Sequence, residues 1–385
     1  MNSLQQNERL EETTDLTLYA GLRLSPSTEF WINPEVDQGF GVSNTVGVAG
    51  FPSGEAYKIG ANAPYLRVPR AFIRSLFALP GGSTTIEGSA NQLGGPVATN
   101  NVTVTLGKFS VVDVFDNNTY AHDPRNDFLN WSIIDAGAFD YAADSWGFTN
   151  GVAVEWNKNW WTLRAGRFQL SSVPNGKVTG FDFSQRMSVV EAEGRYGLGN
   201  LPGKLKLLTF LNEGRMGDYN DALKQAFITG SVPDTAMVRK RSSRAGFAMN
   251  LEQAIGSDAG IFARWSANDG RKEAYEFTEI NKSFATGISV NGRTWTRPND
   301  QFGAAVALNA LSGPAKSYFA SGGSGILIGD GRLNYNTEQI LETFYSMSIS
   351  DQVTFTVDFQ HINNPAYNRD RGPVNLGAIR IHMQF

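Results

Sequence analysis

The chain has 385 residues, and its 33 Lys and Arg against 37 Asp and Glu give a formal net charge of −4. This balance argues against a nucleic-acid partner, because surfaces that bind nucleic acid carry a basic excess. Cysteine is absent, which excludes disulfides, thiolate metal sites and a cysteine nucleophile. The 41 glycines and 12% aromatic residues favour a turn-rich β protein.

Alternation of apolar and polar residues with a period of two is the dominant pattern along the chain, and it predicts strands. The opposite faces carry Gly, Thr, Ser, Asn, Arg and Asp instead of the uniform Lys and Glu coat of a solvated face. In chain order, the apolar rows are Leu16, Leu18, Leu22 and Leu24; Phe148, Val152, Val154 and Trp156; Phe247, Met249 and Leu251; Ile261 and Trp265; and Phe355, Val357 and Phe359.

About fifteen strands can be marked from this pattern. Bacterial single-chain membrane barrels have even strand numbers, so sixteen is the predicted total, with one further strand near 83–91 or 284–293. The marked ranges are 12–24, 28–36, 65–77, 101–110, 148–157, 159–169, 183–196, 203–213, 238–252, 257–268, 274–281, 299–311, 337–349, 352–362 and 373–385.

The connections between these strands alternate in length. Short turns such as 157–159 and 348–352 alternate with long segments at 36–64, 111–147, 215–237 and 312–336. This arrangement is typical of an outer-membrane β-barrel, whose lipid-facing residues alternate with polar ones and leave no long apolar stretch. The alternative is a large soluble β-sandwich or propeller. Strands of roughly 10–13 residues favour the barrel, because ordinary strands have about 5–6.

Three stretches resemble the carbohydrate-selective porins of the OprB type. They are "NPEVDQGFG…GVAGFPSGEAYKIG…PYLRVPRAF" (33–72), "GKFSVVDVFDNNTYAHDPRNDFLNWSIIDAGAFDYAADSWGFTNG" (107–151) and "GDGRLNYNTEQILETFY…VDFQHINNPAYNRDRGPV…RIHMQF" (329–385). The family's usual N-terminal lead-in is missing or shortened, and residues 1–11 are expected to be a periplasmic or flexible lead-in.

The resemblance implies a single sixteen-stranded, up-and-down antiparallel barrel over 1–385 in the outer membrane of a Gram-negative bacterium. It implies passive diffusion of small neutral carbohydrates such as glucose into the periplasm. The surroundings would be outer-membrane lipid and lipopolysaccharide, and the assembly a monomer or a homotrimer. The alternative is a non-selective or anion-preferring general diffusion porin.

A sixteen-stranded barrel is wide enough to hold an aqueous lumen, so a selective pore needs an inward-folded loop. The long, charged and aromatic segment 111–147 is the candidate constriction loop. Its aromatic residues Tyr120 and Trp131 offer stacking faces for sugars. Alternatively, its polar groups satisfy one another through Asx-turns and salt bridges. The candidate polar residues are Asp113, Asp116, Asn117, His122, Asp123, Arg125 and Asp127.

The polar strand faces predict the rest of the lumen, and both charge signs occur there in comparable number. A mixed set suits neutral polyhydroxyl solutes, whereas a single-sign excess makes an ion channel. The alternative for each charge is an ion pair that braces the wall. Neither face of 65–77 is cleanly apolar, which leaves its inward side unassigned. The candidates are Arg23, Glu29, Trp31, Glu35, Arg70, Arg74, Arg164, Arg244, Arg264 and Asp358.

Enzyme activity, a cofactor and a metal site are not expected. Only three histidines exist, and no spacing singles out a carboxylate pair. The C-terminal "AIRIHMQF" alternates to the last residue, with Ile379, Ile381 and Met383 predicted to face lipid. A last strand that ends in Phe385 resembles the signal recognised by the outer-membrane assembly machinery.

Overall fold

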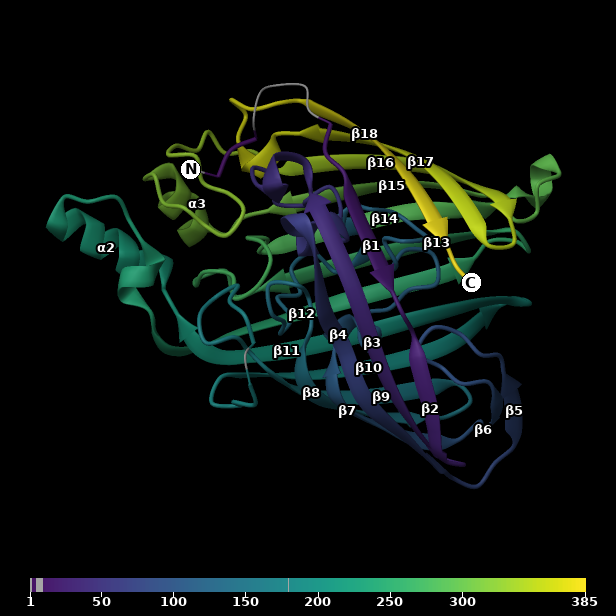
Figure 1. Cartoon of the computed structure of the whole chain (residues 1–385). Coiled ribbons are helices and arrows are strands. Elements are labelled where there is room, and N and C mark those ends of the chain that lie inside the picture. The colour runs from purple at the N-terminus through teal and green to yellow at the C-terminus, as the bar shows by residue number, and fades with distance from the viewer. Residues whose placement is uncertain (1, 5–9, 179) are drawn as a thin grey trace.

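The structure is a computed structural model that describes residues 2–4, 10–178 and 180–385. A 16-stranded antiparallel sheet curls into a barrel (Figure 1). Its strands are β1 (Thr13–Thr17), β2 (Ala20–Ser25), β3 (Thr28–Phe40), β4 (Gly60–Ala78), β7 (Asn101–Phe109), β8 (Thr149–Asn157), β9 (Trp161–Gln169), β10 (Arg186–Leu198), β11 (Leu201–Met216), β12 (Lys240–Ala254), β13 (Ala259–Asn268), β14 (Lys282–Asn291), β15 (Gln301–Ala310), β16 (Glu338–Ser350), β17 (Val353–Asn363) and β18 (Val374–Met383).

The connections differ in length at the two ends of the barrel. At one end, turns as short as residues 199–200 and 351–352 join the strands. Here β5 (Ser83–Ile86) and β6 (Gly95–Ala98) form a separate hairpin. At the other end, long connections contain α1 (Trp131–Ile134), α2 (Tyr219–Thr229) and α3 (Gly313–Ala320). The described part of the chain has no helix long and apolar enough to cross a membrane.

The predicted strands agree with the sheet except at two places. The range 12–24 is divided into β1 and β2, which both pair with β3. The strand expected at 274–281 is wrong, and β14 occupies the alternative position near 284–293. Residues 274–281 alternate in sequence, but Phe277 has a φ of 59° and its ring is buried inside the barrel. Every residue of 274–281 is buried, so apolar and polar side chains both pack inside the barrel, and their mixture in the sequence resembles that of a strand.

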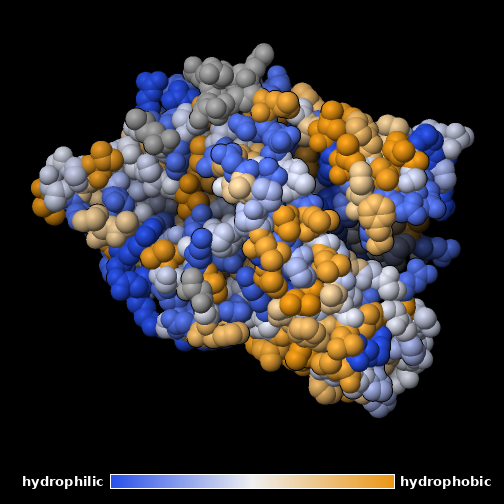
Figure 2. Space-filling model, viewed as in Figure 1, coloured by the Kyte–Doolittle hydropathy of each residue, from blue (hydrophilic) through white to orange (hydrophobic). Residues whose placement is uncertain are grey.

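The outward faces of the strands carry the apolar rows that the sequence predicts. Leu16 is 71% exposed and Ile379 is 70% exposed, at the first and last strands respectively. Figure 2 shows apolar side chains gathered over parts of the face in view. Phe148 is the exception in these rows, because it is only 2% exposed and lies before β8 begins.

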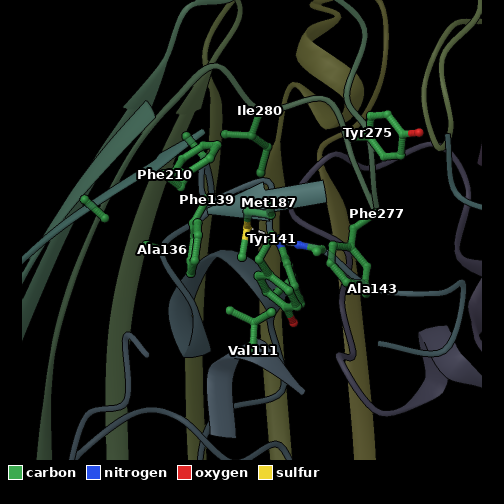
Figure 3. Close-up of a cluster of buried hydrophobic side chains, with 14 of the residues drawn as sticks. Val111, Ala136, Phe139, Tyr141, Ala143, Met187, Phe210, Tyr275, Phe277 and Ile280 are labelled. Carbon is green, nitrogen blue, oxygen red and sulfur yellow. Dashed lines mark hydrogen bonds between the residues drawn. The ribbon is translucent and has the colours of Figure 1, made fainter. Parts of the chain in front are cut away.

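The buried core lies inside the barrel, where loops pack against the inner wall. Phe139 of the 110–148 connection lies 5.2 Å, between ring centroids, from Phe210 of β11. Tyr141 from the same connection and Phe277 from the β13–β14 connection lie 4.7 Å apart (Figure 3). Met187 of β10 completes this part of the cluster. The 110–148 segment is therefore folded into the barrel.

The hydrogen-bonded ladders of the described residues run from β1 and β2 to β18. β2 ends at the turn of residues 26–27 and β18 follows the long 364–373 connection, so both run toward the short-turn end. Residues 1 and 5–9 of the predicted lead-in lie outside the described residues. Asn2 donates hydrogen bonds to the carbonyls of Gly325 and Ile326 at the long-connection end.

Candidate functional site

A β-bulge between β3 and β4 sets the direction of two arginines. Arg67 pairs with Glu35, whereas Arg70 pairs with the residue two positions earlier on β3, so that three residues of β4 oppose two of β3. Pro34 and Pro69 lie within this irregularity, and neither has an N–H for the ladder. The bulge shifts the alternation, and Arg67 and Arg70 both face inward. It also explains why neither face of 65–77 is cleanly apolar.

These two arginines bind carboxylates on the wall and on the inward loop. Arg67 forms ion pairs with Glu35 and Asp37, whose side chains are buried. Arg70 holds Asp113 with two hydrogen bonds, of 2.8 Å from Nε and 2.6 Å from Nη2. The side chains of Arg70 and Asp113 are 17% and 25% exposed. Water therefore reaches this second pair.

A third arginine, Arg125, extends from the inward loop to the first strands. Its Nη2 lies 2.9 Å from Asp15 Oδ1, 3.2 Å from Glu35 Oε2 and 2.7 Å from Glu55 Oε1. Its Nη1 donates to the Tyr19 hydroxyl at 2.9 Å. Arg125 is 15% exposed and Asp15 26%. Together with the pairs of Arg67 and Arg70, this group forms the charged passage, a partly exposed set of opposite charges between β1–β4 and the inward loop.

The pKa values of two carboxyl groups on the inward loop, those of Asp113 and Asp127, differ from their ordinary values. Burial opposes ionisation of Asp113, but the Arg70 guanidinium and the Ser110 N–H outweigh it and hold the pKa of Asp113 below its ordinary value. Burial raises the pKa of Asp127 to about 6. At neutral pH, the Arg70–Asp113 pair is therefore fully ionised.

On its other side, the inward loop is fixed to the wall by buried polar contacts. Arg264 of β13 is 1% exposed, and its Nε lies 3.3 Å from Asp116 Oδ1. Its Nη1 donates to the Ile133 carbonyl at 2.8 Å. Asn250 of β12 donates to Asp116 Oδ1 at 2.7 Å, and the Ala136 N–H donates to Asp116 Oδ2 at 2.6 Å. Arg264 and Asp116 therefore brace the loop and do not face the passage.

Other predicted lumen charges also brace the interior. Asn117 accepts from Lys206 of β11 through its backbone and side-chain oxygens. Arg164 of β9 contacts Glu191 Oε1 at 2.7 Å and Glu193 Oε2 at 2.9 Å. Glu191 in turn accepts from the Asp116 N–H at 2.8 Å.

Charged residues on β12, β16 and β17 also brace the interior. Arg244 of β12 contacts Asp140 at 2.8 Å and is 1% exposed. Glu342 of β16 accepts from the Leu129 N–H at 2.5 Å and the Asn130 N–H at 3.0 Å. Asp358 is 4% exposed and accepts from Gln360 at 3.4 Å. These residues therefore contact the wall or the inward loop, as the alternative of an ion pair that braces the wall describes.

The middle of the loop contains local turns and joins the two ends of the sheet. Asp127 accepts from the N–H groups of His122 and Asp123, both at 3.2 Å. Asp123 accepts from the Arg125 N–H at 2.9 Å, as an Asx-turn does. Arg380 of β18 donates to the carbonyls of Pro124 at 2.6 Å and Asp127 at 3.1 Å. Residues 123–127 thus contact β18 through Arg380 and β1–β3 through Arg125.

Four of the predicted lumen residues lie near the short-turn end, where the β5–β6 hairpin folds against them. The turn between β5 and β6 folds against Arg23, Glu29 and Arg74, whose side chains bond to backbone groups of residues 91–94. Trp31 donates to Glu29 at 2.8 Å and is 4% exposed. Arg23, Glu29 and Arg74 hold the hairpin, Trp31 supports Glu29, and the charged passage lies farther along β3 and β4.

The two aromatic candidates of the loop are also packed. The Tyr120 ring lies over Gly260, where an added Cβ would come within 1.9 Å of the ring. Trp131 stacks on Phe51 and lies tilted against Phe277, with ring centroids 4.9 Å and 4.7 Å away. Trp131 is buried and offers no free face, whereas Tyr120 is half-buried, with one face against Gly260.

Comparison with known proteins identifies the family. Residues 1–385 match the family described as carbohydrate-selective porin, OprB family. The chain belongs to the OprB family. The resemblance expected from the sequence is therefore confirmed over the whole chain, and the protein is a β-barrel porin of the Gram-negative outer membrane.

Individual relatives of this OprB-family porin are distant. Porin AaxA of Chlamydia abortus is 20% identical over 285 residues, which cover 73% of this chain and 53% of that protein. The chain thus spans about half the length of this relative. The high-pH structure of Pseudomonas putida OprB superimposes with a TM-score of 0.76 at 16% identity, covering 100% of this chain and 90% of that one. OprD of Pseudomonas aeruginosa gives a TM-score of 0.46 at 7% identity, covering 97% and 87%.

Sequence reasoning missed several residues of the porin's charged passage, Asp15 among them. Arg67, Asp37 and Glu55 belong to the ion pairs, and Phe148 lies beneath two arginines, 5.5 Å from Arg67 and 4.8 Å from Arg70. The prolines of β3 and β4 were the available signal, because they predict a bulge. Within the described residues, no group of three or more His, Asp or Glu is placed to hold a metal ion.

Proposed function

We propose that this porin passes small neutral carbohydrates by passive diffusion through the charged passage, and that the 111–147 loop is its constriction. The supporting observation is the pairing of charges in the passage. Arg67, Arg70 and Arg125 each face at least one carboxylate at ion-pair distance. Paired charges of both signs present donors and acceptors to hydroxyl groups, and the pairing weakens the single-sign field that would select ions.

Swelling of proteoliposomes tests this function. Vesicles containing the porin swell faster in glucose than in an amino acid of similar size if the passage prefers sugars. Equal rates would remove the sugar preference and leave a non-selective porin. Carboxylates outnumber guanidinium groups in the passage, so a reversal potential showing strong anion preference would also contradict the proposal.

The proposed transport needs no cofactor and no catalytic group, in keeping with a family of transport channels. The outward apolar rows supply the surface for outer-membrane lipid and lipopolysaccharide. The chain end is proposed as the assembly signal. Phe385 follows β18, is fully exposed and is free for recognition by the assembly machinery. A monomer or a homotrimer is compatible with this surface.

A further inference from the structure

A cavity of about 460 Å³ lies at the long-connection end of the barrel. Loop residues on one side and the start of β4 on the other line it. Its chief aromatic and amide side chains are Tyr57, Tyr65, Trp146, Asn44 and Asn175. This mouth cavity is separate from the paired arginines of the passage. Its volume falls within the roughly 300–1,000 Å³ of small-molecule sites.

The aromatic side chains of the mouth cavity are held in place. The Trp146 Nε1–H donates to the Tyr65 hydroxyl at 3.2 Å, and the Lys177 ammonium lies 4.9 Å from the centroid of the Trp146 ring. The Tyr57 hydroxyl donates to Asn175 Oδ1 at 2.9 Å. Tyr57 also stacks on the buried Phe51, with ring centroids 4.6 Å apart. The rings are thus pre-positioned, which lowers the entropic cost of binding a ligand.

The mouth cavity adjoins the charged passage through two chain segments. Tyr65 lies two residues before Arg67 on β4, and alternation of a strand places both on one face. Trp146 lies two residues before Phe148, whose ring lies 5.5 Å from the Arg67 guanidinium. A solute that leaves the cavity along β4 therefore meets Arg67 next.

The chemistry of the lining fits one class of solute. A pyranose ring has an apolar C–H face and a rim of hydroxyl groups. Aromatic rings contact such a face, while amides such as Asn44 and Asn175 supply both donors and acceptors to hydroxyls. An inorganic ion has no apolar face, and a purely apolar solute would offer no hydrogen-bond partner to the amide N–H groups of Asn44 and Asn175.

We propose that the mouth cavity is a binding subsite for a pyranose sugar, which it captures before the sugar enters the charged passage. This inference rests on the proposed sugar transport and adds a first binding step at the external mouth. Binding here raises the local sugar concentration at Arg67.

Block of ionic current by glucose in planar bilayers tests the subsite. Trp146→Ala is expected to weaken the glucose block by about 3- to 10-fold, as expected for the loss of one aromatic contact. Single-channel conductance without sugar should stay close to that of the wild type. Trp160→Ala is the matched control, because Trp160 is 67% exposed at the short turn after β8. Its glucose block should equal that of the wild type.

The results separate this inference from the proposed function. If glucose blocks the current of Trp146→Ala as strongly as that of the wild type, while wild-type vesicles still swell faster in glucose, the subsite is wrong and sugar transport stands. If the wild type shows neither block nor a swelling preference, both fail. Should Trp146→Ala not insert, Trp146→Leu fills much of the same space without an aromatic ring and is expected to give a similar loss, and an unchanged block in that variant would overturn the subsite.

Discussion

A substitution at Arg264 tests how the proposed constriction loop is held in place, because the contact between Arg264 and Asp116 is buried. Arg264→Ala removes the guanidinium from three acceptors of the inward loop. They are Asp116 Oδ1, the Asp116 carbonyl at 3.0 Å and the Ile133 carbonyl at 2.8 Å. Asp116 keeps the Ala136 N–H and Asn250 as donors but loses its counter-charge.

The cost of Arg264→Ala follows from burial. Both side chains are 1% exposed, so the remaining carboxylate has no water to replace the arginine. Removing one partner of such a pair costs about 3–5 kcal/mol. We expect the free energy of unfolding in lipid vesicles to fall by that amount. The loosened loop should also widen the passage, raise single-channel conductance and reduce the preference for glucose in swelling.

A control separates this effect from the loss of any arginine. Arg241 of β12 is exposed and donates to the Ser184 carbonyl at 3.1 Å. Arg241→Ala should change the free energy of unfolding by less than about 1 kcal/mol and leave conductance unchanged. If Arg264→Ala gave wild-type conductance and wild-type stability, the loop would not be held by this contact, and the reasoning would be refuted.

Four further predictions concern the passage, the mouth, the inner contacts of the last strand and the chain end. Arg70→Ala should shift the reversal potential toward cations and Asp113→Asn toward anions, and identical shifts for both would contradict their pairing in an accessible passage. Burial raises the pKa of Glu279 from 4.5 to about 7, so its contribution to stability is fully present below pH 4.5 and is lost as pH rises toward and through 7. Over that window, the wild type should lose roughly 3 kcal/mol relative to Glu279→Gln in denaturant titrations, and parallel pH profiles would refute this. Arg380→Ala should lower the free energy of unfolding by about 1.5–3 kcal/mol, since charge-assisted hydrogen bonds to the loop carbonyls are lost, and an unchanged heat-modifiable gel transition would argue against this role. Deletion of Phe385 should reduce the amount of assembled barrel and leave the conductance of the inserted fraction unchanged, and normal levels of inserted protein would remove the residue as a signal.

Most of the barrel was predictable from sequence because lipid imposes a rule that each strand obeys locally. An outward residue must be apolar, and its neighbours on the strand point the other way. Thus the range 352–362 agrees with β17, Val353–Asn363, to within one residue. Residues 274–281 mislead because an interior loop that is buried along its whole length can mix apolar and polar side chains as a strand does.

The site was less predictable because its contacts join residues that are distant in sequence. Asn118 donates to Asn250 at 2.7 Å across 132 residues, and no local pattern reports such a pair. Charge type alone could not separate Arg264, which braces the loop, from Arg70, which faces water. The bulge at Pro69 interrupts the alternation of β4, so no single parity places both Arg67 and Arg70 inward, and Arg67 was overlooked.

The contacts of Glu342 with the inward loop also determine when the interior can be completed. The two N–H groups that it accepts from lie 213 and 212 residues earlier in the chain. Segment 110–148 therefore precedes its last wall partners, on β16 and β18, by 212 to 256 residues of chain. Contacts of such separation are slow to form, since the entropy of closing the intervening chain is lost first. We therefore expect docking of the loop to be a late event, so that the proposed constriction acquires its final width only as the barrel nears completion.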